Sequence, residues 1–170
     1  MSILGTRSLV WADEADCAAC AHTLARHEAL RDAYIELRGP LGAGKTTFVR
    51  HVLRALGVTG RVKSPSYAVV EAYELPAEKP ASHLAFNRAF NSAFNIWHFD
   101  FYRFKNPREW DDAGFRDLFS APGLKLAEWP EKAQGMLPAA DLRIDLELLD
   151  GDARQVQFSA FTPRGMELLE

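Results

Sequence analysis

The chain has 170 residues, of which 48% are hydrophobic, and this composition suits one globular domain over residues 1–170. Its formal net charge of −3 argues against a generally basic surface for gripping nucleic acid, although a local basic patch is compatible with it. No apolar run reaches the roughly 18 residues of a membrane span, and residues 1–7 lack the apolar core of a secretory signal, so we expect a cytoplasmic protein without a membrane partner.

Strands and helices alternate along most of the sequence. We predict a short edge strand at 8–11 and then a helix at 14–30, which has small apolar residues on one face and Asp13 as its N-cap. The elements predicted next, in chain order, are a strand at 33–38, a glycine-rich turn at 39–44, a helix at 46–56 closed by Gly57, and strands at 66–75, 95–102 and 124–129. Pro107 marks the start of a further helix between the last two strands.

Residues 76–95 interrupt this alternation, because they combine prolines with Ala, Asn and Phe in no clean period. We interpret them as an inserted loop, with a short helix around 83–93 as an option. Beyond them, 142–148 and 156–160 alternate apolar with polar residues around a turn signal at 150–152, which predicts a hairpin. The order of elements predicts an α/β fold, with a mostly parallel central sheet flanked by helices and an antiparallel C-terminal hairpin.

The glycine-rich turn matches the phosphate-binding pattern G-x-x-x-x-G-K-[ST] at every defined position, as Gly39-Pro40-Leu41-Gly42-Ala43-Gly44-Lys45-Thr46. Glycines let backbone N–H groups surround phosphate oxygens, and the positive end of the following helix attracts the same anion. The Lys45 ammonium can reach the β- and γ-phosphates, the Thr46 hydroxyl can ligate Mg²⁺, and Thr47 would lie near the α-phosphate. The predicted nucleotide-binding residues of this loop are Gly42, Ala43, Gly44, Lys45, Thr46 and Thr47. A strand before the loop and a helix after it make a P-loop NTPase-like fold the expectation.

Hydrolysis of a nucleotide needs acidic groups besides the P-loop, to hold Mg²⁺ and to orient a water molecule. Asp100 and Glu128 each end an apolar strand, and ligands gather at the carboxyl ends of parallel strands. We therefore predict Asp100, Glu128 and Lys45 as catalytic residues, with solvated strand-end acids as the alternative for both carboxylates. No guanine-reading N-K-x-D is present, and we interpret the D-x-x-G at 111–114 as a helix end, which favours ATP.

The neighbours of these acids each allow two interpretations. His98 shares a strand face with the first acid and could position water or simply pack, and Arg103 could stabilise a transferring phosphate or form a surface salt bridge. Trp129 could stack on the nucleotide or fill core, and the hydroxyl-rich turn at 64–67 could be a phosphate-sensing switch or a strand entry. We interpret the lone C-x-x-C at 17–20 as a small-residue helix face, because no second ligand pair accompanies it.

Four ordered motifs together resemble the TsaE family, the small bacterial ATPases of the threonylcarbamoyladenosine tRNA modification pathway. They are the P-loop with its following Thr-Phe, Val62-Lys63-Ser64-Pro65-Ser66-Tyr67, His98-Phe99-Asp100-Phe101-Tyr102-Arg103, and Glu128-Trp129-Pro130-Glu131. The resemblance covers most of the chain, from about Trp11 to about Leu149.

The resemblance implies roles for single residues. Thr46 and Glu128 would bind Mg²⁺, Asp100 would be essential for ATP turnover, and Trp129 would lie beside the nucleotide. Further motif residues, in a mobile switch loop or beside the acids, are Ser64, Ser66, Tyr67, His98, Tyr102 and Arg103. Members of the family dock on the TsaB–TsaD pair, whose TsaD modifies the adenosine beside the tRNA anticodon. The resemblance thus implies a partner-dependent ATPase that resets this complex and meets tRNA only through it.

Two features depart from the family pattern, since Ser66 stands where Thr is usual and 76–95 looks longer than usual. The first alters the switch hydroxyl, and the second could cover the site or change the partner interface. Two other functions fit the P-loop itself. One is a small-molecule phosphotransferase with Arg103, Arg108 and Arg116 in a lid, and the other is a non-catalytic nucleotide-sensing adaptor.

Overall fold

The computed structural model describes residues 2–76 and 93–170, so the short helix predicted around 83–93 lies essentially outside the described residues. The elements within these ranges are β1 (Gly5–Trp11), α1 (Glu14–Leu24), η1 (Glu28–Asp32), β2 (Tyr34–Arg38), α2 (Lys45–Ala55), β3 (Val70–Leu75), β4 (Phe94–Asp100), α3 (Pro107–Asp112), α4 (Phe115–Ser120), β5 (Leu124–Glu128), η3 (Pro130–Ala133), β6 (Leu142–Leu148), β7 (Arg154–Ala160) and α5 (Pro163–Glu167). None of the helices in the described ranges has the length and apolar character needed to cross a bilayer.

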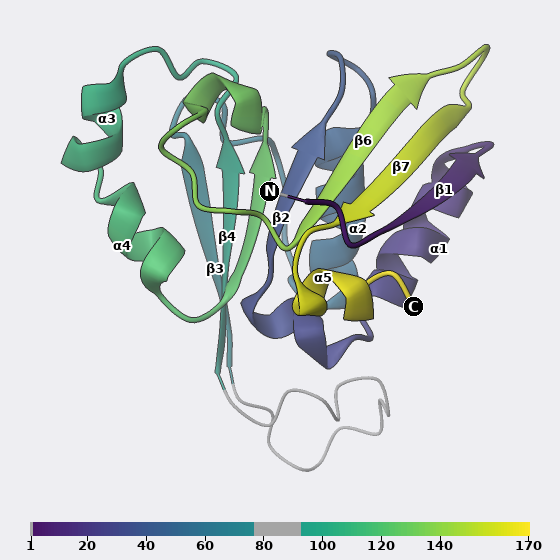
Figure 1. Ribbon diagram of the computed structural model, residues 1–170, viewed down its shortest axis with the longest axis horizontal. Coiled ribbons are helices and arrows are strands. Elements are labelled where there is room, and N and C mark those ends of the chain that lie inside the picture. Colours follow the sequence, from purple (N-terminus) through teal and green to yellow (C-terminus); the bar gives the residue numbers. More distant parts are fainter. Residues whose placement is uncertain (1, 77–92) are drawn as a thin grey trace.

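A seven-stranded sheet forms the centre of the fold, in the strand order β1-β7-β6-β2-β5-β4-β3 (Figure 1). The four middle strands, β6, β2, β5 and β4, run parallel, whereas the outer pairs β1–β7, β7–β6 and β3–β4 are antiparallel. The predicted parallel centre, the C-terminal hairpin and the edge position of β1 are confirmed. The carboxyl ends of β2, β5 and β4 consequently meet at one end of the sheet, where ligands of α/β folds usually bind.

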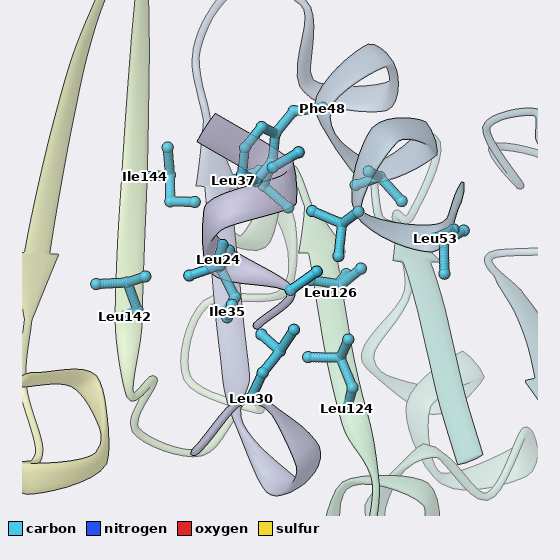
Figure 2. Close-up of a cluster of buried hydrophobic side chains, with 14 of the residues drawn as sticks. Leu24, Leu30, Ile35, Leu37, Phe48, Leu53, Leu124, Leu126, Leu142 and Ile144 are labelled. Atoms are coloured by element: carbon cyan, nitrogen blue, oxygen red, sulfur yellow. The ribbon is translucent and has the colours of Figure 1, made fainter. Parts of the chain in front are cut away.

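Side chains that alternate along the strands divide between two apolar clusters on opposite faces of the sheet. On one face, Ile35 and Leu37 of β2 pack against Phe48 and Leu53 of α2 and Leu24 of α1 (Figure 2). The other face carries an aromatic cluster built from β4, α3 and α4, whose rings belong to Phe99, Phe101, Trp110, Phe115 and Phe119. Burial on both faces holds the central strands rigidly, and this fixes the positions of the residues at their ends.

The helix predicted at 14–30 is too long. Asp13 caps it as predicted, since its carboxylate accepts hydrogen bonds from the N–H groups of Ala15 and Asp16 at 2.8 and 3.2 Å. The α-helix, however, ends at Leu24, and residues 28–32 form the short 3₁₀-helix η1 instead. The fully buried Leu30 anchors η1, so that the chain turns back into β2 over a few residues.

The strand predicted at 66–75 begins only at Val70. Val69 has a φ of 67°, which is outside the strand region, and its N–H donates to the carbonyl of Pro65 at 2.6 Å. The residues before β3 therefore form a turn rather than a strand. This turn brings Ser64 into contact with the last residue of β4, Asp100.

Candidate functional site

The P-loop lies between β2 and α2, at the carboxyl end of the parallel strands. Gly39 has a φ of 139°, and a Cβ there would collide with the carbonyl oxygen of Leu146, so only glycine fits. Gly44 is the N-cap of α2 with a φ of 103°, and no side chain caps this helix or places a negative charge in its first turn. The N-terminus of α2 is consequently an uncapped, positively polarised end of the kind that binds anions.

Lys45 begins α2, and its side chain folds back over the loop. Its ammonium donates to the carbonyl oxygens of Gly39 and Pro40 at 2.7 and 2.9 Å and lies 3.9 Å from the centroid of the Trp129 ring. Burial lowers the pKa of Lys45, and the carboxylates of the site, Glu128 foremost, oppose this shift. A cation is thus held within the glycine-rich loop.

Glu128, the last residue of β5, joins the P-loop helix to β4. Its Oε2 accepts a hydrogen bond from the Thr46 hydroxyl at 2.9 Å, and its Oε1 lies 2.8 Å from Nε2 of His98. Glu128 is 2% exposed and His98 is fully buried. The carboxylate is therefore desolvated and oriented by two side chains, one for each oxygen.

Asp100, the last residue of β4, is the register partner of Glu128 on the neighbouring parallel strand. It is 3% exposed, and its two oxygens accept hydrogen bonds from the Ser64 hydroxyl and, at 2.9 Å, from the N–H of Tyr102. Neither acid is the solvated strand-end group that was the alternative interpretation. Both lie at the end of the sheet that carries the P-loop.

An aromatic rim surrounds these buried groups. Trp129 is half-buried with a φ of 57°, its N–H donates to the Leu37 carbonyl at 3.3 Å, and the Tyr102 ring lies 5.0 Å away. Tyr67 is 85% exposed, and the guanidinium of Arg103 stacks on its ring at 4.3 Å and donates to its hydroxyl at 3.3 Å. Among the described residues, Arg103 thus contacts Tyr67 rather than a carboxylate.

Ser66 and Thr47 complete the predicted set. Ser66 is half-buried in the turn before β3, and Thr47 is half-buried in the first turn of α2. The fold therefore gathers the P-loop, both acids, His98 and Ser64 into one cluster. Tyr67 and Arg103 form the outer part of the same end of the sheet.

Comparison with known proteins identifies the family of the chain. The family model described as "Threonylcarbamoyl adenosine biosynthesis protein TsaE" matches residues 11–156. The chain belongs to the TsaE family. Curated relatives named tRNA threonylcarbamoyladenosine biosynthesis protein TsaE include one from Haemophilus influenzae, 38% identical over 135 residues, which are 79% of this chain and 75% of the relative. Another, from Bacillus subtilis, is 29% identical over 136 residues, 80% of this chain and 75% of the relative.

The fold of this TsaE-family chain is also similar to a solved structure. The crystal structure of Bacillus subtilis YdiB superposes with a TM-score of 0.69 at 23% sequence identity and covers 99% of this chain and 95% of that chain. At this identity the similarity concerns the fold. Family membership rests on the sequence matches, which place the chain in tRNA threonylcarbamoyladenosine biosynthesis.

Sequence reasoning missed Arg154, the first residue of β7. Its Nε donates to the carbonyl of Ala43 at 3.1 Å, and its Nη2 contacts the carbonyl of Gly42 at 3.4 Å. Arg154 and Thr47 also line a cavity of about 450 Å³ that extends from the P-loop to Asp13 and the start of α1. No motif marks an arginine 111 residues away as a P-loop contact, and only the position of β7 beside β6 brings it there.

The donor groups at the P-loop fit Mg²⁺ in one specific way. Within residues 2–76 and 93–170, no group of three or more His, Cys, Asp or Glu side chains is arranged to hold a metal. The hydroxyl of Thr46 donates directly to the carboxylate of Glu128, so two oxygen ligands lie side by side, and Mg²⁺ normally combines such protein oxygens with water and substrate phosphates. Cys17 and Cys20 are free, and burial raises their pKa values to about 12 and 11, which fits a helix face better than a reactive site.

Proposed function

We propose that the chain is a P-loop ATPase of the tRNA threonylcarbamoyladenosine modification machinery. Its Mg²⁺-dependent hydrolysis of ATP would be stimulated by TsaB and TsaD and would reset the complex that modifies the adenosine beside the anticodon, so that tRNA is met through the complex. The observation that carries this proposal is the contact between Thr46, at the end of the P-loop, and the buried carboxylate of Glu128. Such an enzyme needs at least a nucleotide-binding loop and, beside it, a desolvated carboxylate that can bind the metal.

The phosphate chain would lie against the N-terminus of α2, within reach of Lys45. The N–H groups of the loop would face the phosphate oxygens, and Lys45 would exchange its contacts with Gly39 and Pro40 for the β- and γ-phosphates. Mg²⁺, held by Thr46 and Glu128, would neutralise negative charge on the phosphates. The cavity of about 450 Å³ beside Thr47 has the size expected for the nucleoside part.

Asp100 has the position expected of a group that orients water. It lies one strand away from Glu128, and its side chain is fixed by the Ser64 hydroxyl and the Tyr102 N–H. A carboxylate fixed in this way accepts a hydrogen bond from water in a defined direction, which contributes to hydrolysis through positioning. Ser64 belongs to the turn after α2, and this contact therefore links the proposed switch loop to the proposed catalytic acid.

The test is a turnover assay on wild type, Lys45→Ala and Glu128→Ala, with and without TsaB–TsaD. We expect free phosphate as the product, stimulation by the partners, and a loss of at least about 100-fold in each variant, the scale of a removed charge-stabilising group. Glu147→Ala, at an exposed position on β6, is the control for loss of a carboxylate and should match wild type. Unchanged turnover in both site variants would refute the site, and absent stimulation would refute the role in the complex.

The same assay separates the two alternatives. A phosphotransferase would yield a phosphorylated metabolite in place of free phosphate, and an adaptor would bind ATP without turnover even beside its partners. Within residues 2–76 and 93–170, two of the three arginines named for a phosphotransferase lid make contacts other than a lid would require. Arg116 pairs with Asp111 at 3.2 Å on the surface, and Arg103 stacks on Tyr67.

A further inference from the structure

His98 is a buried histidine that forms a hydrogen bond with the proposed metal ligand, Glu128. It lies on β4, two residues before Asp100 and on the same face of the strand. Its Nε2 is 2.8 Å from Oε1 of Glu128, which accepts from Thr46 through its other oxygen. The imidazole, the carboxylate and the hydroxyl therefore form a continuous chain from the core of the sheet to the P-loop helix.

The direction of this hydrogen bond defines the tautomer of the ring. A carboxylate only accepts, so Nε2 of His98 carries the hydrogen and donates to Glu128. The other ring nitrogen, Nδ1, is buried and has no hydrogen-bond partner among the described residues. Leaving a buried polar atom unpaired is unfavourable, so an apolar ring would serve packing better at this position. A role in packing alone thus does not account for a histidine here.

We propose that His98 is a positioning residue, which fixes the Glu128 carboxylate so that its second oxygen points at the Thr46 hydroxyl, where Mg²⁺ would bind. The torsion at the end of a glutamate side chain is soft, and a free carboxylate would sample many orientations. With one oxygen held by His98, the direction of the other is set. This inference rests on the proposed function, because it gives His98 a purpose only if Glu128 is a metal ligand.

In metalloproteins generally, the residues that hydrogen-bond a metal-binding carboxylate influence the affinity for the metal. Replacing a group that orients a metal ligand typically weakens metal binding about 10–100-fold. The surroundings of His98 strengthen this expectation, because His98 and Glu128 are both nearly inaccessible to water, and a hydrogen bond in such surroundings is stronger than one exposed to solvent. The same strand also ends in Asp100, so β4 would orient one acid through His98 and provide the other.

The experiment measures the affinity for a fluorescent ADP analogue at a series of Mg²⁺ concentrations, from none (in EDTA) to saturation. Its readout is the Mg²⁺ midpoint, the concentration at which half of the Mg²⁺-dependent gain in affinity is reached. His98→Gln and His98→Asn are a matched pair, since the Gln amide nitrogen occupies the place of Nε2 and the Asn amide does not reach it. We expect His98→Asn to raise the Mg²⁺ midpoint about 10–100-fold, with affinity in EDTA within about twofold of wild type. His98→Gln should keep the midpoint within about threefold, because it retains the donor.

Two outcomes would overturn this role for His98. One is an equal effect of the Asn and Gln variants, and the other is an unchanged midpoint in His98→Asn when Glu128→Gln shifts it. If Glu128→Gln itself leaves the midpoint unchanged, the metal assignment in the proposed function fails instead. Should His98→Asn not fold, His98→Leu takes its place as the variant without the donor, and for the role to stand it must raise the midpoint about tenfold or more while His98→Gln stays within about threefold of wild type.

Discussion

Arg154 gives the sharpest test of how the fold prepares the P-loop for a nucleotide. The loop is open at Gly42 and Gly44, since no atoms lie within 4 Å of an ideal Cβ at either position. For the loop N–H groups to face an anion, the carbonyls between them must point away, and Arg154 binds two of these carbonyls at 3.1 and 3.4 Å. Replacing Arg154 by Ala should therefore loosen the loop as well as remove a positive charge.

The size of the effect follows from these contacts. A hydrogen bond from a charged donor contributes about 1.5–3 kcal/mol, but Arg154 is partly exposed and its second contact is long. We therefore expect a loss of about 1–2 kcal/mol in nucleotide binding, which is about 5–30-fold in affinity. The melting temperature without nucleotide should fall by only a few degrees, since about 1 kcal/mol corresponds to about 2–4 °C in a chain of this size.

Calorimetric titration with ADP and Mg²⁺ measures the affinity, and thermal unfolding measures the stability. Arg154→Lys should recover part of the affinity, because it keeps the charge but loses the fork that reaches two carbonyls. Arg116→Ala, which removes an arginine from a surface pair with Asp111, is the control and should bind like wild type. Normal ADP affinity in Arg154→Ala would refute the argument that this residue prepares the loop.

Three further predictions concern single contacts. Gly39→Ala should destabilise the fold by about 2–4 kcal/mol in urea unfolding, because its φ of 139° and the Leu146 carbonyl both oppose a side chain. Asp141→Ala should cost about 2–4 kcal/mol by the same measurement, since it leaves the buried N–H of Tyr34, now 2.8 Å from a carboxylate oxygen, unpaired, and an effect below about 1 kcal/mol would contradict this. Thr46→Ala should raise the Mg²⁺ concentration needed for tight ADP binding about tenfold or more, whereas Thr46→Ser should stay near wild type because it keeps the hydroxyl.

The parts of the fold that could be predicted depend on local chemistry. The N-cap at Asp13 and the left-handed Gly57 after α2 each reflect a preference carried by one residue. The P-loop could be found because its glycines, Lys45 and Thr46 must stand at fixed spacing around a phosphate. The two acids followed from a general property of parallel sheets, whose strands end together, and this required no knowledge of strand order.

The contacts that organise the site could not be predicted, because they join distant parts of the chain. Ser64 and Asp100 are 36 residues apart, His98 and Glu128 are 30 apart, and Arg154 is 111 residues from Ala43. Each depends on the order in which strands enter the sheet, which hydrophobic periodicity does not encode. The same limit explains the early end of α1, since the need to return to β2 is a tertiary constraint on a sequence with adequate helix propensity.

The two acids differ in what holds them, and this difference bears on how partners could control the proposed enzyme. Glu128 is fixed by His98 from the core of the sheet and by Thr46 from α2, both parts of the rigid framework. Asp100 is held instead by the N–H of Tyr102 and by the hydroxyl of Ser64, which lies three residues before the almost fully exposed Tyr67. A protein that contacts this segment and draws Ser64 away would remove one of the two hydrogen bonds on the Asp100 carboxylate, whereas the bonds on Glu128 come from other elements. Under the proposed function, binding of Mg²⁺ and nucleotide would then be intrinsic to the chain, whereas the rate of hydrolysis would depend on the docked partner.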